Sequence, residues 1–105
     1  MDGLKIYMTV GGANIVAQEI STKGGKRVVK GASYLEMHPS QVRFNFSALK
    51  FFEPSGEMTL YDTGLLGEQE MPPMVAERFK LYLKQLELEA EQLKKEVEAV
   101  KNQEQ

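Results

Sequence analysis

The chain of 105 residues contains no cysteine and only one histidine, His38. The lack of cysteine excludes disulfides, a thiolate nucleophile and cysteine-bound zinc, and a single imidazole excludes any metal site that needs two histidines. The chain also lacks a run of about eighteen apolar residues, which a membrane-spanning helix requires. Its first residues, Met1-Asp2-Gly3, are not those of a signal peptide. We therefore predict a cytoplasmic protein that needs no metal or cofactor and does not bind a membrane.

The chain also lacks a surplus of basic residues. Residues 1–72 carry seven basic and eight acidic residues, and residues 73–105 carry six and seven. Nucleic-acid-binding domains usually have a clear basic surplus. The one basic concentration surrounds Gly24-Gly25, a pair typical of a solvated hairpin tip. It consists of Lys23, Lys26, Arg27 and Lys30.

Glycine and proline are absent after Pro73. Residues 74–105 are rich in glutamate, lysine, leucine and glutamine, a composition that favours a helix. Before Pro72-Pro73, apolar residues recur at every second position, as they do in β-strands. The change in pattern predicts two units, a β region over residues 1–72 and one helix over residues 73–105.

Five alternating runs predict the strands of the β region. They cover residues 4–10, 15–20, 27–37, 42–46 with a continuation to Leu49 and Phe51-Phe52, and 58–66. Gly31 interrupts the third run and predicts a bend or bulge. In the last run, Leu65 and Leu66 are candidates for inward-facing positions. Five short strands joined by tight turns are too few for a sandwich, so we predict a small, strongly bent barrel.

The glycine pair in Gly11-Gly12-Ala13-Asn14 has two readings. One is a phosphate-binding loop, but the lysine of a P-loop and the spaced glycines of a dinucleotide loop are missing, and a strand follows. The other is a hairpin turn, for which adjacent glycines and a nearby asparagine supply positive φ angles. We interpret the stretch as a turn. His38 has no partner pattern, and Glu53 and Glu57 flank a turn, so we predict no catalytic residue and no enzymatic activity.

Several short motifs accompany this order of elements. They are Gly11-Gly12-Ala13-Asn14, Val28-Val29-Lys30-Gly31-Ala32, Ala48-Leu49-Lys50-Phe51-Phe52-Glu53, Ser55-Gly56-Glu57-Met58-Thr59-Leu60 and Arg78-Phe79-Lys80-Leu81-Tyr82. Over about residues 4–83, motifs, order and hydrophobic pattern resemble the small Sm-like proteins of tailed phages, cyanophages in particular. The resemblance implies a five-stranded SH3-like barrel whose copies form a ring by pairing edge strands, in the cytoplasm of an infected host cell.

The resemblance also raises the question whether this chain has the residues with which Sm proteins bind RNA. Sm proteins bind RNA through a loop that bears Asp or Asn and through an Arg-Gly or Lys-Gly pair. In the stretch 36–41 only His38 and Gln41 could stack on or hydrogen-bond to a base, and in 61–64 Asp62 stands where a basic residue would help. The candidate nucleic-acid contacts are therefore Lys23, Lys26, Arg27, Lys30 and His38.

The helical region contains a heptad pattern. Apolar residues alternate four and three apart, and they form a seam of Phe79, Leu83, Leu86, Ala90, Leu93, Val97 and Val100. With Leu83, Ala90 and Val97 at the a positions, a parallel pair of helices would place Glu89 beside Lys94 of the second copy and Glu96 beside Lys101. Both pairs are opposite in charge. This pattern favours a parallel self-association.

An amphipathic helix more often packs against its own chain. For residues 74–86 we favour that reading, because Met74, Val75, Leu81 and Tyr82 widen the apolar face. For residues 88–101 the apolar face narrows and the other face is densely charged, so we favour contact with other helices. Leu88 lies outside the seam and would suit a larger bundle or another protein.

Together these patterns lead to three hypotheses of function. The first is a non-catalytic, ring-forming homo-oligomer, a pentamer or hexamer, that acts as a scaffold or adaptor for a host or phage protein. The second is a ring that binds RNA or single-stranded DNA. The third is an oligomer that sequesters a small molecule or nucleotide between its subunits, for which the residues give no positive sign.

Overall fold

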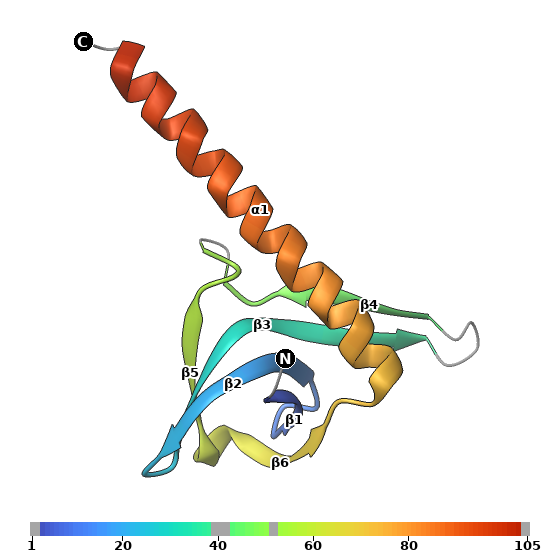
Figure 1. The fold of residues 1–105 in the computed structure, drawn as a ribbon. Coiled ribbons are helices and arrows are strands. Elements are labelled where there is room, and N and C mark those ends of the chain that lie inside the picture. The colour runs from blue at the N-terminus through green and yellow to red at the C-terminus, as the bar shows by residue number, and fades with distance from the viewer. Residues whose placement is uncertain (1–2, 39–42, 51–52, 104–105) are drawn as a thin grey trace.

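The computed structural model of the protein describes residues 3–38, 43–50 and 53–103. Six strands precede one long helix (Figure 1). The elements are β1 (Leu4–Thr9), β2 (Asn14–Lys23), β3 (Lys26–His38), β4 (Arg43–Ala48), β5 (Glu57–Tyr61), a 3₁₀ turn η2 (Asp62–Gly64), β6 (Leu65–Glu70) and α1 (Pro73–Gln103). The predicted β region followed by a single helix is confirmed.

The strands form one antiparallel sheet in the order β4-β3-β2-β1-β6, with β5 also paired to β3. The long strand β3 has two neighbours in succession: its first part, Lys26 to Lys30, pairs with β5, and its second part, Ser33 to His38, pairs with β4. Gly31 lies between these parts with φ of 69°, which a glycine adopts without strain. The bend predicted at Gly31 is therefore where β3 changes partner.

The strand count differs from the sequence-based expectation of five. The predicted run 58–66 is divided by η2 into β5 and the start of β6, because the sequence Asp62-Thr63-Gly64 forms a turn there. The divided run also corrects one side-chain assignment: Leu65 packs in the core, whereas Leu66 is exposed, since neighbouring residues of a strand point to opposite faces. The expected strand positions Val42, Phe51 and Phe52 lie outside the described residues.

Both glycine pairs form hairpin turns, as predicted. In the first turn, the backbone N–H groups of Thr9 and Gly12 donate to the carbonyl oxygens of Ala13 and Thr9, each at 3.0 Å. In the second, Gly24 and Gly25 both have positive φ, the geometry of a two-residue hairpin loop whose twist matches the strands. The stretch Gly11 to Asn14 is thus a structural corner, and a strand follows it.

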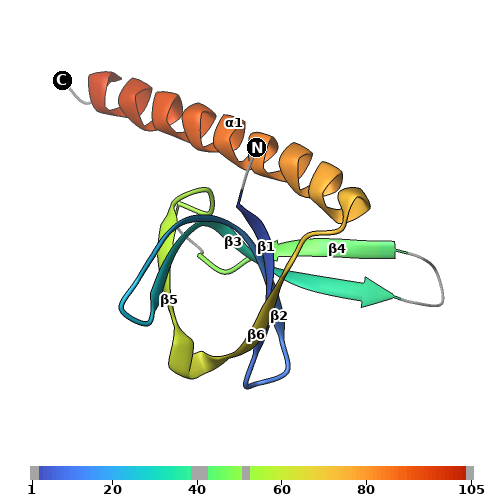
Figure 2. The same cartoon turned by 60° about the horizontal axis from the view of Figure 1, so that its bottom comes forward.

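The sheet is apolar on both faces and curls around one of its two cores. Figure 2 shows that β1, β2, β3, β5 and β6 curl around a common centre. Buried side chains fill this centre. That inner core is Tyr7, Ile15, Ala17, Val29 and Ala32, with Leu49, Met58, Leu60 and Leu65 against it. The strand order is an open path among the described residues, so a fully closed barrel stays a prediction.

The second core lies between the outer face of the sheet and α1. It contains Leu4, Ile6, Val16, Leu35, Met71, Val75, Phe79 and Leu83. The helix starts at Pro73, where a missing N–H costs nothing, and the N–H of Ala76 donates to the carbonyl of Pro72 at 2.9 Å. The aromatic rings of Phe46 and Phe79 meet edge to face, with centroids 5.7 Å apart. The first half of the helix is thereby part of the same folded unit as the sheet.

Candidate functional site

The helix α1 has two halves with different surroundings. In the proximal half, residues 73–86, Phe79 and Leu83 belong to the core between helix and sheet, and Leu86 is also buried within the chain. In the distal half, residues 88–101, the helix extends past the sheet into solvent (Figures 1 and 2). The prediction that residues 74–86 pack on their own chain is confirmed. The same finding corrects the seam: Phe79, Leu83 and Leu86 serve the internal core and are not available to a second copy.

The distal half keeps an apolar stripe that remains about half exposed in the described part of the chain. Leu93, Val97 and Val100 are 62%, 48% and 55% exposed, and Leu88, on another face, is 58% exposed. Side chains of this size are usually buried somewhere in the working form of a protein, and a contiguous apolar stripe is typical of a binding surface. The part of the seam that remains for self-association is Ala90, Leu93, Val97 and Val100.

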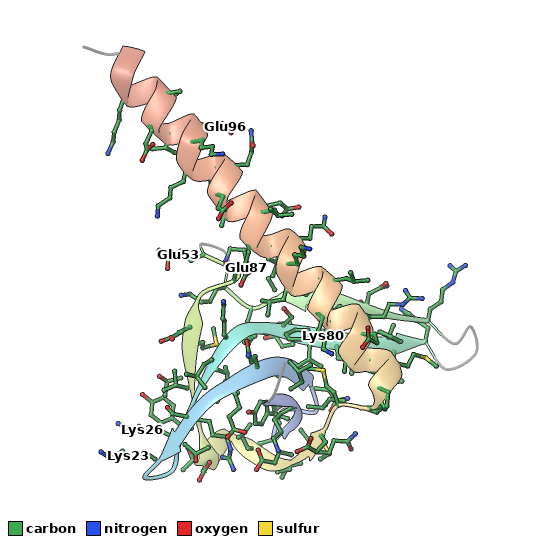
Figure 3. All side chains as sticks on the ribbon, viewed as in Figure 1. Lys23, Lys26, Glu53, Lys80, Glu87 and Glu96 are labelled. Atoms are coloured by element: carbon green, nitrogen blue, oxygen red, sulfur yellow. The ribbon has the colours of Figure 1, made fainter. Side chains whose placement is uncertain are left out.

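A groove of about 490 Å³ lies beside this stripe. One wall is the distal half of α1, at Ala90, Leu93 and Val97, and the other is the turn of residues 53–56 that joins β4 to β5. Figure 3 shows the Glu53 side chain on the side of this turn that faces away from the helix, and Glu96 on α1 toward its C-terminal end. The sequence predicted the turn Pro54-Ser55-Gly56, but it gave no sign that the turn faces the helix.

The predicted nucleic-acid contacts do not gather into one surface. Lys23 and Lys26 lie together at the β2–β3 hairpin tip (Figure 3), and His38 lies at the opposite end of β3. Lys26 is near the ring of Tyr61, with Nζ 5.8 Å from its centroid. The pocket at this tip, about 180 Å³, also includes Asp62, which lowers its attraction for phosphate.

Arg27 and Lys30 are engaged by carboxylates of the same chain. The guanidinium of Arg27 donates to Glu68 from Nε at 3.2 Å and also hydrogen-bonds to Asp62, and Glu19 lies 4.0 Å away. The ammonium of Lys30 donates to Glu87 of α1 at 2.6 Å. Both cations are thus neutralised internally, and two lysines are left as the exposed basic charges of the predicted set.

Arg27 has a structural task that local sequence patterns did not reveal. It lies on β3, and its partners Glu19, Asp62 and Glu68 lie on β2, η2 and β6. The guanidinium therefore connects β3 to β6, the strand at one end of the sheet order, where no ladder of backbone hydrogen bonds joins them among the described residues.

Comparison with known proteins does not place the chain in a family. No protein-family model matches it, and no curated protein sequence matches it significantly. The interpretation of this protein's function therefore rests on its own geometry.

The described residues contain neither a metal-binding cluster nor a membrane-spanning helix. No group of three or more potential metal-ligating side chains gathers within ranges 3–38, 43–50 and 53–103. In the same part of the chain, α1 is too polar to cross a bilayer and no other helix has the length.

Proposed function

We propose that the protein is a non-catalytic, self-assembling scaffold or adaptor of the Sm-like kind, encoded by a phage, whose copies associate and present a surface to a protein partner. The observation that carries this proposal is the distal half of α1, which extends away from the fold with an exposed apolar stripe. A helix of this kind is only marginally stable in water without a partner.

The sheet offers a second means of assembly. Strands β5 and β6 each pair with one neighbour among the described residues, so each has a free backbone edge. Exposed apolar side chains lie on both strands, Tyr61 at 55% and Leu66 at 74%. Free edges readily pair with another chain. Pairing of β5 in one copy with β6 in the next would produce a ring of the Sm-like type, a pentamer or hexamer.

The two contacts support one another energetically. Burying one large aliphatic side chain is worth about 1.5–3 kcal/mol, and the distal stripe offers three such side chains per copy that are already half buried. Association costs roughly 4–15 kcal/mol. For a pair of distal helices alone, the free energy gained by burial would about equal the cost of association. A stable assembly therefore needs the strand edges or further apolar contact as well.

Light scattering after size-exclusion chromatography tests the proposal. We expect a mass that is an integral multiple of the single-chain mass at micromolar concentration and that resists dilution. A single-chain mass across the accessible range of concentrations would refute both the ring and the scaffold role built on it.

Nucleic-acid binding is the second candidate, since Lys23, Lys26 and the exposed ring of Tyr61 lie together at one tip. Stacking on an aromatic ring beside lysines is a common way to bind single strands. A labelled single-stranded oligonucleotide titrated at about 50 mM salt tests it. Binding that is lost in the variant Lys23→Glu/Lys26→Glu would favour this function, and no binding by the wild-type protein would exclude it.

A further inference from the structure

The groove between residues 53–56 and the distal half of α1 is preformed. Its turn wall is fixed by backbone hydrogen bonds: the N–H of Gly56 donates to the carbonyl of Glu53 at 2.8 Å, and the carbonyl of Gly56 accepts from the N–H of Gly31 on β3 at 3.2 Å. The ammonium of Lys50 adds a bond to the carbonyl of Glu57 at 3.2 Å. The helix wall combines the apolar side chains of Ala90, Leu93 and Val97 with the charged side chains of Glu91 and Lys94. A groove with an apolar stripe bordered by charges, open to solvent, suits an amphipathic helix.

The turn also stores backbone strain. Glu53 has φ of 55°, and it is the one described non-glycine residue with a positive φ. Such a conformation costs about 1–2 kcal/mol for an L-residue. Strained residues persist where the surrounding structure fixes them, and they are frequent at binding sites. Pro54 and Ser55 follow Glu53 directly, and both line the groove.

Of the charged residues that line the groove, Glu53 is paired with Lys50, whereas the charges on the helix wall form no ion pair within the described residues. Lys94, which lines the groove, and Lys101 make no ion pair among the described residues. Glu89 and Glu96 accept hydrogen bonds only from the neutral side chains of Gln85 and Gln92. By contrast, Lys30 and Lys80 nearer the sheet are both paired with glutamates. The distal half carries three lysines and four glutamates without an ion pair among the described residues, and Glu89, Lys94, Glu96 and Lys101 are the four that flank the seam.

We propose that this groove receives the distal half of α1 from a second copy of the same chain, with the two helices parallel. The inference rests on the proposed self-assembly and names its contact surface. In a parallel pair, Lys94 of one copy meets Glu89 of the other, and Lys101 meets Glu96, so all four contacts are attractive. In an antiparallel pair the g positions face each other, which brings glutamate against glutamate.

The fold explains why the contact is confined to the distal half. At residues 79–86 the a and d face of each helix is covered by its own sheet, so the two helices must diverge toward their N-termini. The distal seam alone is short. The turn wall extends the apolar surface that a second helix contacts, and it supplies contact area that a two-heptad pair lacks.

A pair of leucine substitutions tests the groove directly. Leu93 lines the groove, whereas Leu88 lies on another face of the same helix with nearly the same exposure, 58% against 62%. We expect Leu93→Glu to weaken self-association at least tenfold and Leu88→Glu to leave it within twofold of wild type. Because both side chains are exposed within one chain, neither change should alter the unfolding midpoint of the single chain, which circular dichroism at concentrations below those of association would check.

The orientation is tested by a charge exchange and by cross-linking. Lys94→Glu should weaken association, and the double variant Glu89→Lys/Lys94→Glu should restore it. Because the chain has no cysteine, Val97→Cys places a single thiol at the seam, where parallel copies bring like positions together. We expect rapid disulfide-linked dimers from Val97→Cys and few from Glu98→Cys, which points away from the seam.

The outcomes separate this inference from the proposed function. If wild type is an oligomer but Leu93→Glu has the same mass, assembly proceeds through strand edges and the groove proposal is wrong, while the scaffold role stands. If Leu93→Glu and Leu88→Glu weaken association equally, a nonspecific helix contact replaces the groove. A charge exchange that fails to restore association, with Glu98→Cys linking as fast as Val97→Cys, would overturn the parallel arrangement. A single-chain wild type would refute both proposals.

Discussion

At the scale of single residues, Tyr7 stands out because its side chain is fully buried in the inner core. Its hydroxyl has no hydrogen-bond partner among the described residues. Burial raises the pKa of this hydroxyl well above its ordinary value of 10.0, and the nearby carboxylates of Glu19 and Glu68 raise it further. The chain keeps a polar atom in an otherwise apolar environment, at a cost in stability.

We predict that Tyr7→Phe stabilises the protein by about 1 kcal/mol, because a buried hydroxyl without a partner costs about 1–3 kcal/mol. The gain should grow above pH 10. There the unfolded chain releases the Tyr7 proton while the folded chain retains it, so wild-type stability falls with rising pH. Urea denaturation at pH 7 and pH 11 measures both effects, with the half-exposed Tyr34→Phe as control. A loss of stability in Tyr7→Phe at pH 7 would show that the hydroxyl is hydrogen-bonded in solution.

Gly31 combines a positive φ with a close contact. A Cβ atom added there would lie 2.5 Å from Cδ1 of Leu83, nearer than side-chain carbons approach one another. At Gly12, φ is 90° and nothing lies within 4 Å of such a Cβ. The two glycines therefore separate the cost of conformation from the cost of crowding.

We predict that Gly31→Ala destabilises the fold by roughly 2–5 kcal/mol, the sum of about 1–2 kcal/mol for the left-handed backbone and about 1–3 kcal/mol for overpacking against α1. Gly12→Ala should reduce stability only by the cost of the left-handed backbone, about 1–2 kcal/mol. Equilibrium unfolding in urea compares the two variants. Equal losses would mean that Leu83 moves aside freely and that the helix is not held at this point.

Short-range residue patterns predicted the turns well. The glycines at positions 11, 12, 24 and 25 and the bend at Gly31 follow from backbone geometry, which a few neighbouring residues determine. The ion pairs of Arg27 could not be predicted, since its partners are up to 41 residues away and depend on how the sheet curls. For the same reason, the sequence predicts Arg27 and Lys30 as candidate nucleic-acid contacts, whereas the structure pairs both with carboxylates of the same chain.

At the scale of elements, α1 shows what periodicity can and cannot predict. One unbroken seam runs from Phe79 to Val100, yet its two parts meet different surroundings. The period indicates an apolar face, but it does not indicate where the sheet ends beneath the helix. Within residues 74–86, Val75 and Tyr82 pack on the sheet as predicted, whereas Met74 and Leu81 are 63% and 69% exposed and do not belong to the internal contact. The turn at 53–56 was predicted as a turn, and its place beside the helix follows only from the pairing of β5 with β3.

Because the two halves of α1 have different surroundings, the same leucine-to-alanine substitution should change folding stability by very different amounts in each half. We predict that Leu83→Ala costs about 2–5 kcal/mol of folding stability, because its side chain is buried in the helix–sheet core. Leu93→Ala should change stability by less than about 0.5 kcal/mol, measured at concentrations where the protein is a single chain. Thermal unfolding of both variants checks the pair. A large loss in Leu93→Ala would place this side chain in an intrachain core.

At the scale of the whole molecule, the sheet and the proximal helix form one folded unit and the distal helix is an extension of it. The fold class was predictable because strand alternation and a glycine-free helical stretch are strong local signals. Barrel closure, edge pairing and self-association depend on contacts between distant or separate segments, which a single sequence pattern does not specify. The proposed role places those contacts at the free edges of β5 and β6 and at the groove beside α1.

The central claim is that copies of this chain assemble through the distal half of α1. The most direct measurement is the solution mass of wild type, Leu88→Glu and Leu93→Glu by light scattering over a dilution series in the micromolar range. We predict that wild type and Leu88→Glu have the same oligomeric mass and that Leu93→Glu dissociates at concentrations at least tenfold higher. An identical mass for all three proteins at every concentration would contradict the claim.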